Sequence, residues 1–330
     1  MRALVMTGPS PGPDRTEIRQ LPDPRPGAGQ VSIDVACAGI NFIDVMARRG
    51  DPGYVTSWPY VPGLEVAGTI RETGGGVRGL SAGQRVAAFT RGGGLAEIAL
   101  ADAALAVPLP GEVPLSAAAA APRMLSTALL LLQHAARPEP GERVLMHSAS
   151  GGVGSAVAQV VAALGGGLRI GTVGRADKIP DAHRSGWDVT LVRDGNLTQA
   201  IRDAARGGVD VILDPLGTSL LDVDLEVAAA GGRIVLFGNP GGGRPAALPA
   251  LSQLIAGNVA IAGFSMSRLS MTAPATVAAA LGSGLRLLAD GKADLRVTTI
   301  SSLDQVPAIH QLLAEGRGTG KYVATLKVPD

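Results

Sequence analysis

The first third of the chain consists of short hydrophobic or alternating segments separated by turn residues. Alternation of apolar and polar positions over about four to eight residues is typical of strands with one buried face. Glycine runs at residues 74–76 and 92–94 mark tight turns between such segments. We therefore predict a small β-rich domain. Its predicted strands are residues 3–6, 31–35, 65–71, 85–89 and 96–100.

The pattern changes after residue 110. An Ala- and Leu-rich stretch at residues 116–136, with Pro122 near its start, predicts a buried helix or a pair of helices. Beyond it, short β-branched runs alternate with helical segments such as residues 153–164, which is typical of βαβ units around a parallel sheet. This part predicts an α/β fold with a doubly wound sheet. Its predicted strands are residues 143–147, 169–173, 189–192, 209–213, 233–237 and 259–263.

The remainder of the chain, from residue 275 onward, predicts two more helices and two more strands. After a long helix come a strand at residues 295–300, an amphipathic helix at residues 303–314 and a closing strand at residues 322–327. Such an ending either completes the parallel sheet or returns to the first domain. The pattern alone leaves both arrangements open.

Composition excludes several classes of function. Lysine and arginine total 29 and the acidic residues 28, so a net charge of +1 creates no field that would attract nucleic acid or anionic lipid. Aromatic residues make up 3% of the chain, too few to form a stacking platform for single strands. The single cysteine, Cys37, excludes an intramolecular disulfide and a cysteine-rich zinc cluster. Because we expect neither a signal peptide nor a membrane span, we predict a soluble cytoplasmic protein.

The most informative segment joins the first strand of the parallel sheet to the helix that follows it. This segment contains Gly151, Gly152 and Gly154. Glycines at such a turn let the main chain approach a pyrophosphate, which the free N–H groups and the dipole of the helix N-terminus stabilise. The first glycine of the G-x-G-x-x-G motif is replaced by Ala149. The βα units around the segment favour a dinucleotide site over an ordinary tight turn.

The end of the second strand indicates which dinucleotide binds. An NAD site usually has an acidic side chain there, about 20 residues beyond the glycines, to bind the ribose hydroxyls. The chain instead has Gly174, Arg175 and Lys178. Both cations suit the 2′-phosphate of NADPH. The nearby Asp177 counts against this interpretation, and a solvated loop is the structural alternative for both cations. We therefore predict NADPH as the cofactor.

Several blocks together resemble the medium-chain dehydrogenase/reductase superfamily, and within it the zinc-independent quinone oxidoreductases related to zeta-crystallin. The blocks extend over nearly the whole chain and are residues 38–50, 62–68, 148–154, 214–217, 237–239 and 320–323. The resemblance implies a GroES-like catalytic domain at residues 1–121 and 265–330, and a Rossmann NADPH-binding domain at residues 122–264. It also implies a cleft between these domains and a homodimer formed through the last strand of the Rossmann sheet.

The zinc-dependent relatives of this family would need a cysteine in place of Asn41 and a histidine in place of Leu64. Their structural zinc lobe is replaced by a short turn at residues 89–95, and the four histidines have no metal-binding spacing. A bare carbonyl accepts hydride poorly without a Lewis acid, and a quinone or an activated C=C bond accepts it more readily. We therefore expect no metal and a conjugated acceptor.

The resemblance also implies the residues of the active site. Asn41 and Asp44 would lie near the nicotinamide and the acceptor, and Thr127 would approach the carboxamide, so these three are the catalytic candidates. Purely structural alternatives are a helix cap for Asn41, a first-turn acid for Asp44 and an ordinary helix residue for Thr127. The predicted cofactor-binding residues are Asn41, Thr127, Ser150, Gly151, Gly152, Val153, Gly154, Gly174, Arg175, Lys178, Arg193, Leu216, Phe237, Gly238, Asn239 and Arg317.

Two departures from the family pattern affect the expected ligands. Met46 replaces a frequent tyrosine, which makes the acceptor pocket more open and more apolar, and Val192 replaces a tyrosine that stacks near the adenosine. Tyr54 and Tyr60 lie close to Met46 in sequence and are candidates for a proton donor or for the pocket wall. Packing is the simpler explanation for both.

Taken together, the chain is expected to be an NADPH-dependent, metal-free reductase that transfers a hydride to a quinone or another conjugated acceptor. An enoyl-thioester or enone reductase of the kind that modifies polyketides is the alternative among enzymes. A non-catalytic NADPH-binding protein is the alternative outside them.

Overall fold

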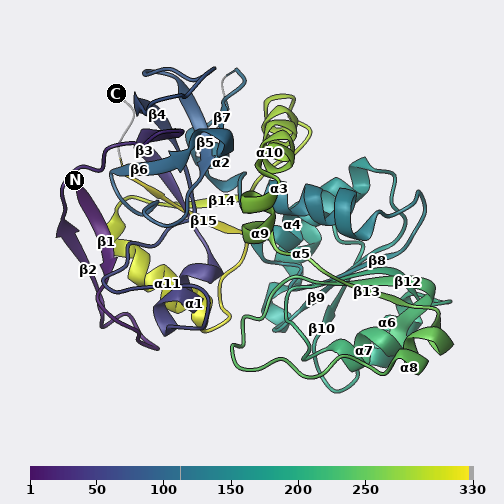
Figure 1. Ribbon diagram of the computed structural model, residues 1–330. Coiled ribbons are helices and arrows are strands. Elements are labelled where there is room, and N and C mark those ends of the chain that lie inside the picture. The colour runs from purple at the N-terminus through teal and green to yellow at the C-terminus, as the bar shows by residue number, and fades with distance from the viewer. Residues whose placement is uncertain (112, 327–330) are drawn as a thin grey trace. The chain divides into compact units, whose positions relative to one another are not determined.

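The computed structural model describes residues 1–111 and 113–326, and the chain divides into two compact units (Figure 1). Unit 1 comprises Met1–Ser126 and Leu269–Asp330, and unit 2 comprises Thr127–Arg268. Of the two arrangements that the sequence left open for the end of the chain, the return to the first unit is the observed one. The sequence-based boundaries lay between residues 121 and 122 and between residues 264 and 265.

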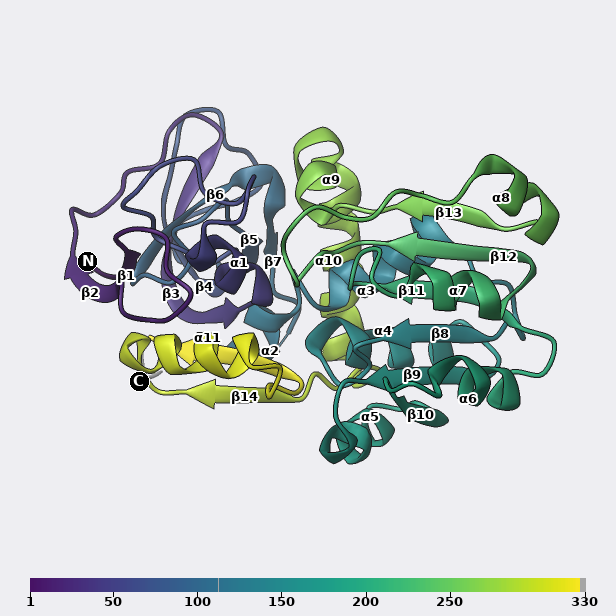
Figure 2. The same cartoon turned by 90° about the horizontal axis from the view of Figure 1, so that it is seen from below.

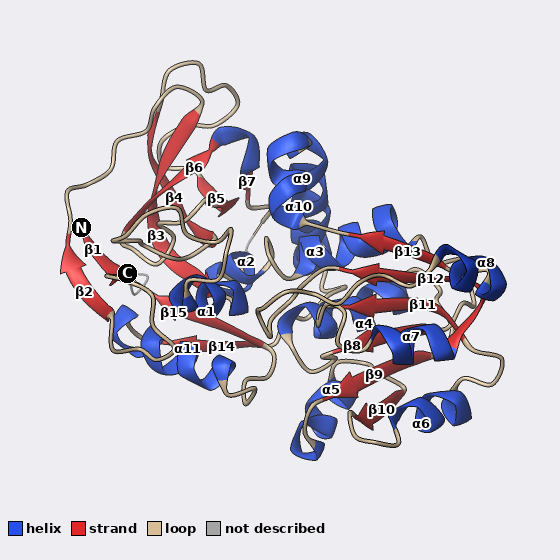
Figure 3. Cartoon of the chain, turned by 60° about the horizontal axis from the view of Figure 1, so that its bottom comes forward, coloured by secondary structure: helices blue, strands red, loops and turns tan. Residues whose placement is uncertain are grey.

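Unit 1 is built mainly from antiparallel strands (Figure 3). In its seven-stranded sheet the order is β14-β15-β3-β4-β5-β7, and β6 pairs with β3; β1 and β2 form a separate two-stranded sheet. The strands are β1 (Arg2–Met6), β2 (Thr16–Gln20), β3 (Gln30–Ile40), β4 (Glu65–Thr73), β5 (Arg85–Phe89), β6 (Ile98–Asp102), β7 (Ala106–Pro108), β14 (Val297–Ile300) and β15 (Lys321–Thr325). The helices are α1 (Phe42–Arg49), α2 (Leu115–Ala120), α10 (Pro274–Ala289) and α11 (Val306–Ala314), with short 3₁₀ turns at Ala103–Leu105 and Leu303–Gln305.

The central strand of unit 1, β3, shows how the sequence specifies this sheet. Val31, Ile33 and Val35 alternate along the strand and pack in one core with side chains of β4 and β5. The strand runs on to Ile40, well beyond the predicted residues 31–35, because β4 and β15 pair with its second half. These long-range partners extend the strand past the clear alternation, and they bring its end to the candidate site.

Unit 2 is a six-stranded parallel sheet with the order β10-β9-β8-β11-β12-β13 (Figure 2). From β8 the chain adds strands toward one edge of the sheet, and from β11 it adds strands toward the other edge. The boundary between β8 and β11 is therefore the switch point at which doubly wound sheets bind ligands. The strands are β8 (Val144–His147), β9 (Arg169–Val173), β10 (Val189–Val192), β11 (Val209–Asp214), β12 (Ala228–Leu236) and β13 (Ala260–Gly263). The helices are α4 (Gly152–Ala163), α5 (Ile179–Arg184), α6 (Leu197–Ala204), α7 (Leu221–Val227) and α8 (Leu251–Gly257), with a 3₁₀ turn at Ala176–Lys178 and a π-helical turn at Leu131–Ala136.

The core of unit 2 forms where the strands of the sheet meet α6 and α7. Leu145, Ile170 and Ile212, from three adjacent strands, pack with Ile201 of α6 and Leu221 of α7. The predicted α/β class, with a β-rich domain and a doubly wound domain, is confirmed. The β9 and β10 strands match the predicted residues, and the other strands of this sheet differ from the prediction at their ends.

Several elements differ from the sequence-based prediction, and strands β2 and β7 were not predicted. Of the predicted helix or pair of helices at residues 116–136, the pair is observed: α2 and α3 (Leu125–Leu130) are followed by the π-helical turn. Pro122 lacks an N–H group and interrupts the first helix. Strand β12 begins at Ala228 and ends at Leu236, so that Phe237 follows it, and a further helix, α9 (Met266–Thr272), precedes α10. Lys327, predicted to end the last strand, lies outside the described residues.

Across the described part of the chain, residues 1–111 and 113–326, no helix combines the length and the apolar character that crossing a membrane requires.

The close pairing of β3 with β4 depends on Gly68. A Cβ atom there would lie 2.1 Å from the Asp34 carbonyl oxygen, beside a register irregularity of β3. We expect Gly68→Ala to lower the free energy of unfolding by about 1–3 kcal/mol or more, because the backbone must shift to relieve the clash. Gly75→Ala is the matched control, since nothing lies within 4 Å of a Cβ atom there, and it should change stability by less than about 0.5 kcal/mol. Urea denaturation measures both variants, and equal midpoints would contradict the expectation.

Candidate functional site

Strand register brings three polar side chains together at one end of the seven-stranded sheet. Lys321 is the first residue of β15 and lies beside Asn41, which directly follows β3. Glu65 is the first residue of β4, on the other side of β3. A Cβ atom at Gly39 would lie 2.3 Å from Glu65 Oε1, so the absence of a side chain there makes room for the carboxylate.

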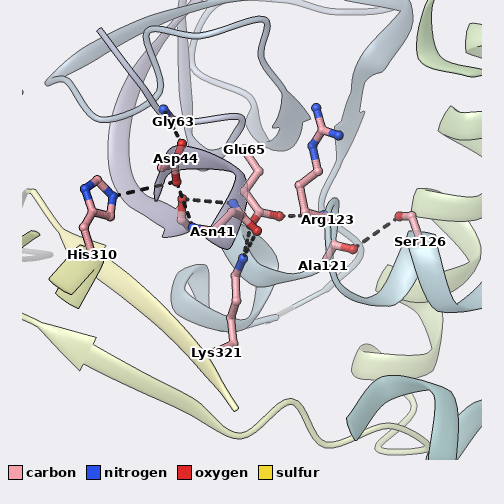
Figure 4. Close-up of polar contacts among 10 residues, drawn as sticks. Asn41, Asp44, Gly63, Glu65, Ala121, Arg123, Ser126, His310 and Lys321 are labelled. Atoms are coloured by element: carbon pink, nitrogen blue, oxygen red, sulfur yellow. Dashed lines mark hydrogen bonds and ion pairs between the residues drawn. The ribbon is translucent and has the colours of Figure 1, made fainter. Parts of the chain in front are cut away.

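These three side chains form a buried polar cluster, which we call the Asn41 cluster (Figure 4). Asn41 Nδ2 donates to Glu65 Oε1 at 2.9 Å, and Asn41 Oδ1 accepts a hydrogen bond from Lys321 Nζ at 2.5 Å. Lys321 Nζ also donates to Glu65 Oε1, and the backbone N–H of Arg123 donates to Glu65 Oε2 at 2.6 Å. Lys321 and Glu65 are 4% and 0% exposed, so the ion pair is fully desolvated. The cluster fixes the orientation of the Asn41 amide at both ends.

Asp44 is placed to hold the main chain around the start of α1. Its Oδ2 accepts the N–H of Asn41 at 2.8 Å, and its Oδ1 accepts the N–H of Gly63 at 3.1 Å (Figure 4). Burial raises the pKa of Asp44 to about 6, although both N–H groups and Lys321 oppose this shift. His310 Nε2 lies 4.0 Å from Asp44 Oδ2, and burial lowers the pKa of His310 to about 3. Asp44 lies in the first turn of α1, as its structural alternative expects, and its assignment to the catalytic site stays a prediction.

The two tyrosines named as proton-donor candidates are also in unit 1. Burial raises the pKa of Tyr60 to about 12, with a further contribution from Asp44. Burial and Asp51 also raise the pKa of Tyr54. Both phenols are therefore weaker acids than a free tyrosine, and their part in proton transfer stays a prediction.

The glycine-rich loop of unit 2 turns the chain from β8 into α4. Ser148 has a φ of 60°, and Gly151 is the N-cap of the helix. A Cβ atom at Gly154 would lie 2.6 Å from the Ser148 carbonyl oxygen, so only glycine lets the helix pack this closely on the loop. The first N–H groups of a helix have no intrahelical acceptor. In α4 these belong to Gly152, Val153 and Gly154, and Ser150, 5% exposed, precedes them.

The alanine at position 149 is accommodated by the neighbouring strand. The left-handed conformation falls on Ser148, so Ala149 itself needs no positive φ. A Cβ atom at Gly171 of β9 would lie 2.5 Å from the Ala149 methyl carbon. The glycine that the loop lacks is therefore compensated by a glycine on β9, which leaves room for the methyl group.

Cations gather at the carboxyl end of β9. Gly174 follows the strand and is exposed, and Arg175 forms an ion pair with Asp177 at 2.7 Å. Lys178 is half-buried; burial lowers its pKa, and the neighbouring charges of Arg175 and Arg193 lower it further. Arg175, Lys178 and Arg193 thus lie at the point where a dinucleotide fold meets the adenosine ribose, with Asp177 and Asp181 near Lys178.

The loops that follow β11 and β12 lie against each other at the same edge of the sheet. The N–H of Leu216 donates to Asp214 Oδ1 at 2.6 Å. A Cβ atom at Gly238 would lie 2.3 Å from the carbonyl oxygen of Pro215, so the two loops approach within main-chain contact. Phe237 and Asn239 flank this glycine and are both half-buried.

The remaining two predicted site residues lie outside these groups. Thr127 is part of α3 and is 6% exposed. Arg317 follows α11, is exposed, and pairs with Glu315 at 3.2 Å. The assignment of both residues to the cofactor stays a prediction.

Sequence reasoning missed Glu65 and Lys321 as site residues. Both lie in blocks that resemble the family, at residues 62–68 and 320–323, yet 256 positions separate them in sequence. Their pairing depends on β3 lying between β4 and β15. A lysine at the start of the last predicted strand was the available signal, and nothing local indicated its partner.

The donor atoms of the Asn41 cluster do not suit zinc. An amide and the side chain of Leu64 stand where a thiolate and an imidazole would bind, and a lysine ammonium contacts the glutamate instead of a metal. Among residues 1–111 and 113–326, no three His, Cys, Asp or Glu side chains converge as metal ligands would.

The Lys321–Glu65 pair permits a stability test. We expect Lys321→Met to lower the free energy of unfolding by about 3–5 kcal/mol, because it leaves a buried carboxylate without its counter-ion. The double variant E65Q/K321M should recover part of this loss, since a neutral amide then replaces the unpaired charge. Lys292→Met is the control: Lys292 pairs with Asp290 at 3.3 Å on the surface and should contribute about 1 kcal/mol or less. Urea denaturation that shows equal effects for both lysines would contradict the expectation.

Comparison with known proteins agrees with this geometry. Residues 27–111 match the alcohol dehydrogenase GroES-like domain, and residues 152–282 match the zinc-binding dehydrogenase domain. The chain is 31% identical over 300 residues to quinone oxidoreductase-like protein 2 of Bos taurus, covering 90% of this chain and 85% of that protein. It is 34% identical over 309 residues to the spectinabilin polyketide synthase system protein NorB of Streptomyces orinoci, covering 90% of this chain and 13% of that protein.

Solved structures lead to the same group. The quinone oxidoreductase of Escherichia coli, complexed with NADPH, has a TM-score of 0.89 at 25% identity, over 98% of this chain and 100% of that one. A mycobacterial protein complexed with NADPH also has a TM-score of 0.89, at 28% identity, over 98% of this chain and 99% of that one. The fold, the glycine-rich loop and these relatives together show that the chain belongs to the quinone oxidoreductase-like oxidoreductases of the medium-chain dehydrogenase/reductase superfamily.

Proposed function

We propose that the protein is an NADPH-dependent, metal-free reductase that transfers a hydride to a quinone or another conjugated acceptor. The observation that carries this proposal is the pairing of a tightly packed glycine-rich turn with three cations at the end of β9. The turn suits a pyrophosphate and the cations suit a 2′-phosphate. The NADPH complexes of similar proteins support the same cofactor.

The residues of unit 2 fit this cofactor. The free N–H groups at the start of α4 would bind the pyrophosphate oxygens, and the missing Cβ atom of Gly154 lets the helix begin directly against the loop. Arg175, Lys178 and Arg193 would contact the adenosine phosphate. The loops after β11 and β12 would contact the nicotinamide half through Leu216, Phe237, Gly238 and Asn239. When bound, NADPH supplies the hydride from C4 of its nicotinamide.

The absence of suitable zinc ligands favours a conjugated acceptor. With Asn41 and Leu64 at the ligand positions, no Lewis acid is available there to polarise a simple carbonyl. We propose that the acceptor binds beside the Asn41 cluster, whose Lys321 and Glu65 hold the amide in one orientation. The protein contributes mainly by orientation and by exclusion of water, which lower a barrier by up to roughly 7–11 kcal/mol.

Two other functions are kept for specific reasons. Similarity to a polyketide synthase system protein supports an enoyl-thioester or enone reductase, since such a substrate is also a conjugated acceptor. A protein that binds NADPH without turnover would show the same nucleotide-binding geometry. The oxidation of NADPH with each class of acceptor, or its absence, distinguishes these functions.

Steady-state oxidation of NADPH tests the proposal. We expect turnover with 1,4-benzoquinones that persists after dialysis against a chelator, because no step requires a metal. Faster turnover with a 2-enoyl thioester would favour the enoyl reductase, and binding without turnover of either would favour the non-catalytic protein. Loss of activity on chelation, with recovery on addition of zinc, would contradict the metal-free proposal.

We also propose that two copies of the chain form a homodimer through the β13 edge of the six-stranded sheet. Strand β13 ends the sheet; its first and last residues are exposed and its two middle residues are half-buried. Beside it, Leu248, Leu251 and Ile255 are 61%, 71% and 71% exposed. An open strand edge and apolar side chains on one side of a protein are features that an interface covers.

Light scattering after size-exclusion chromatography tests the dimer. The double variant L251E/I255E should be monomeric, because two charges would have to be buried in the interface. Met271→Glu is the control, since Met271 is 54% exposed but lies in unit 1. A dimeric L251E/I255E variant, or a monomeric wild type, would rule out this interface.

A further inference from the structure

A buried chain of hydrogen bonds lies under the carboxyl ends of β8, β9 and β10. His147, the last residue of β8, is 0% exposed, and its Nε2 lies 2.8 Å from Oδ1 of Asp224 on α7. Its Nδ1 lies 2.8 Å from Oγ1 of Thr172 on β9. Arg193 follows β10, and its Nη1 donates to the Thr172 hydroxyl at 3.3 Å and to the Thr172 carbonyl oxygen at 3.4 Å. Three residues from β8, β9 and α7 and one from the loop after β10 thus form one connected path.

The chemistry of these groups sets a direction for the path. With its proton on Nε2, His147 donates to the Asp224 carboxylate and accepts the Thr172 O–H at Nδ1. The only hydrogen of the Thr172 hydroxyl is then used, and its lone pairs are left for Arg193. Each group along the path thus donates to the next one toward Asp224: Arg193 to Thr172, Thr172 to His147, and His147 to Asp224. The Thr172 hydroxyl is therefore held as an acceptor for the Arg193 guanidinium.

Arg193 differs from its neighbouring arginines in what it contacts. Arg169 and Arg175 each bind both oxygens of a carboxylate, that of Asp188 and that of Asp177. Within the described residues, no carboxylate lies at ion-pair distance from Arg193, and its side-chain hydrogen bonds go to the neutral oxygens of Thr172. The guanidinium is therefore held in place while its charge stays without an acidic partner in contact.

The other side of this guanidinium lies over Gly174. A Cβ atom at Gly174 would lie 2.9 Å from Arg193 Nη2, so any larger residue would displace the side chain. Gly174 is at the end of the second strand, where dinucleotide folds place the adenosine ribose and its 2′ substituent. The path through Thr172 thus ends in a half-buried cation beside the expected 2′ position.

We infer that Asp224, His147 and Thr172 are positioning residues that hold Arg193 as a determinant of specificity for the 2′-phosphate of NADPH. This inference rests on the proposed function. It adds how one of the proposed cations, Arg193, is oriented before the nucleotide binds. A long side chain loses rotamer freedom when it binds a ligand. Contacts that already restrict Arg193 in the free protein reduce this cost, so more of the phosphate interaction contributes to affinity.

The test compares the dissociation constants of NADPH and NADH, measured by fluorescence titration. Arg193→Met should weaken NADPH about 10-fold or more and leave NADH within about 2-fold, because only NADPH carries the phosphate that the guanidinium binds. Thr172→Val removes the hydroxyl at nearly constant volume and should weaken NADPH about 3-fold or more with little effect on NADH. Thr172→Ser retains the hydroxyl and should preserve the wild-type ratio of the two constants.

Two further variants complete the test. Arg169→Met is the control, since Arg169 is at the opposite end of β9 and pairs with Asp188, and the ratio should stay at the wild-type value. Arg193→Lys keeps the charge but lacks the planar fork that spans Thr172 and Gly174, and should lose part of the preference for NADPH. If circular dichroism shows that T172V is unfolded, the preference of R193K for NADPH over NADH is the remaining test.

The outcomes separate this inference from the proposed function. The positioning role would be overturned if T172V weakened both nucleotides equally. It would also be overturned if the ratio of the NADPH and NADH dissociation constants were the same in T172V and T172S, or were unchanged in R193M or R193K. In each of those cases, tight binding of NADPH by the wild type would leave the proposed function intact. A wild-type protein that binds neither nucleotide would overturn the proposed function, and this inference with it.

Discussion

The arrangement of unit 2 depends on how closely the main chain can turn from β8 into α4. Ser148 takes the left-handed conformation and Gly154 has no Cβ atom, so the helix begins directly against the loop. His147 ends β8 one residue before this turn and pairs with Thr172 of β9. The proposed pyrophosphate site and the buried path to Arg193 therefore begin at adjacent positions of the chain.

Both units bury groups that can carry a charge, and in each unit several of them are linked by direct hydrogen bonds. In unit 1, Lys321 and Glu65 hold each other and the Asn41 amide. In unit 2, His147 joins Asp224 to Thr172. Such groups contribute little net stability compared with apolar side chains of the same size, and their removal one at a time is costly. Their effect here is geometric, because each cluster determines where one exposed or half-buried functional group points.

The same physical reasoning connects the missing zinc ligands to the proposed chemistry. A lysine ammonium now meets the glutamate at the start of β4, and the amide beside it is a weak metal ligand. If no Lewis acid binds there, as we propose, acceptors that are already activated by conjugation are favoured. The proposed hydride transfer then requires from the protein only binding, orientation and the exclusion of water.

The sequence by itself determined the elements and the local chemistry: the change from a β-rich domain to alternating strands and helices, the glycine-rich turn, and the cations after β9. These follow from periodicity and from residues close together along the chain. Tertiary structure alone decided that Lys321 meets Glu65, that Asp224 supports His147 from 77 positions away, and that Arg193 meets Thr172 of β9. The physical reason is that such contacts depend on strand order, register and rotamers. Those are settled only when distant segments pack together, and no local pattern records them.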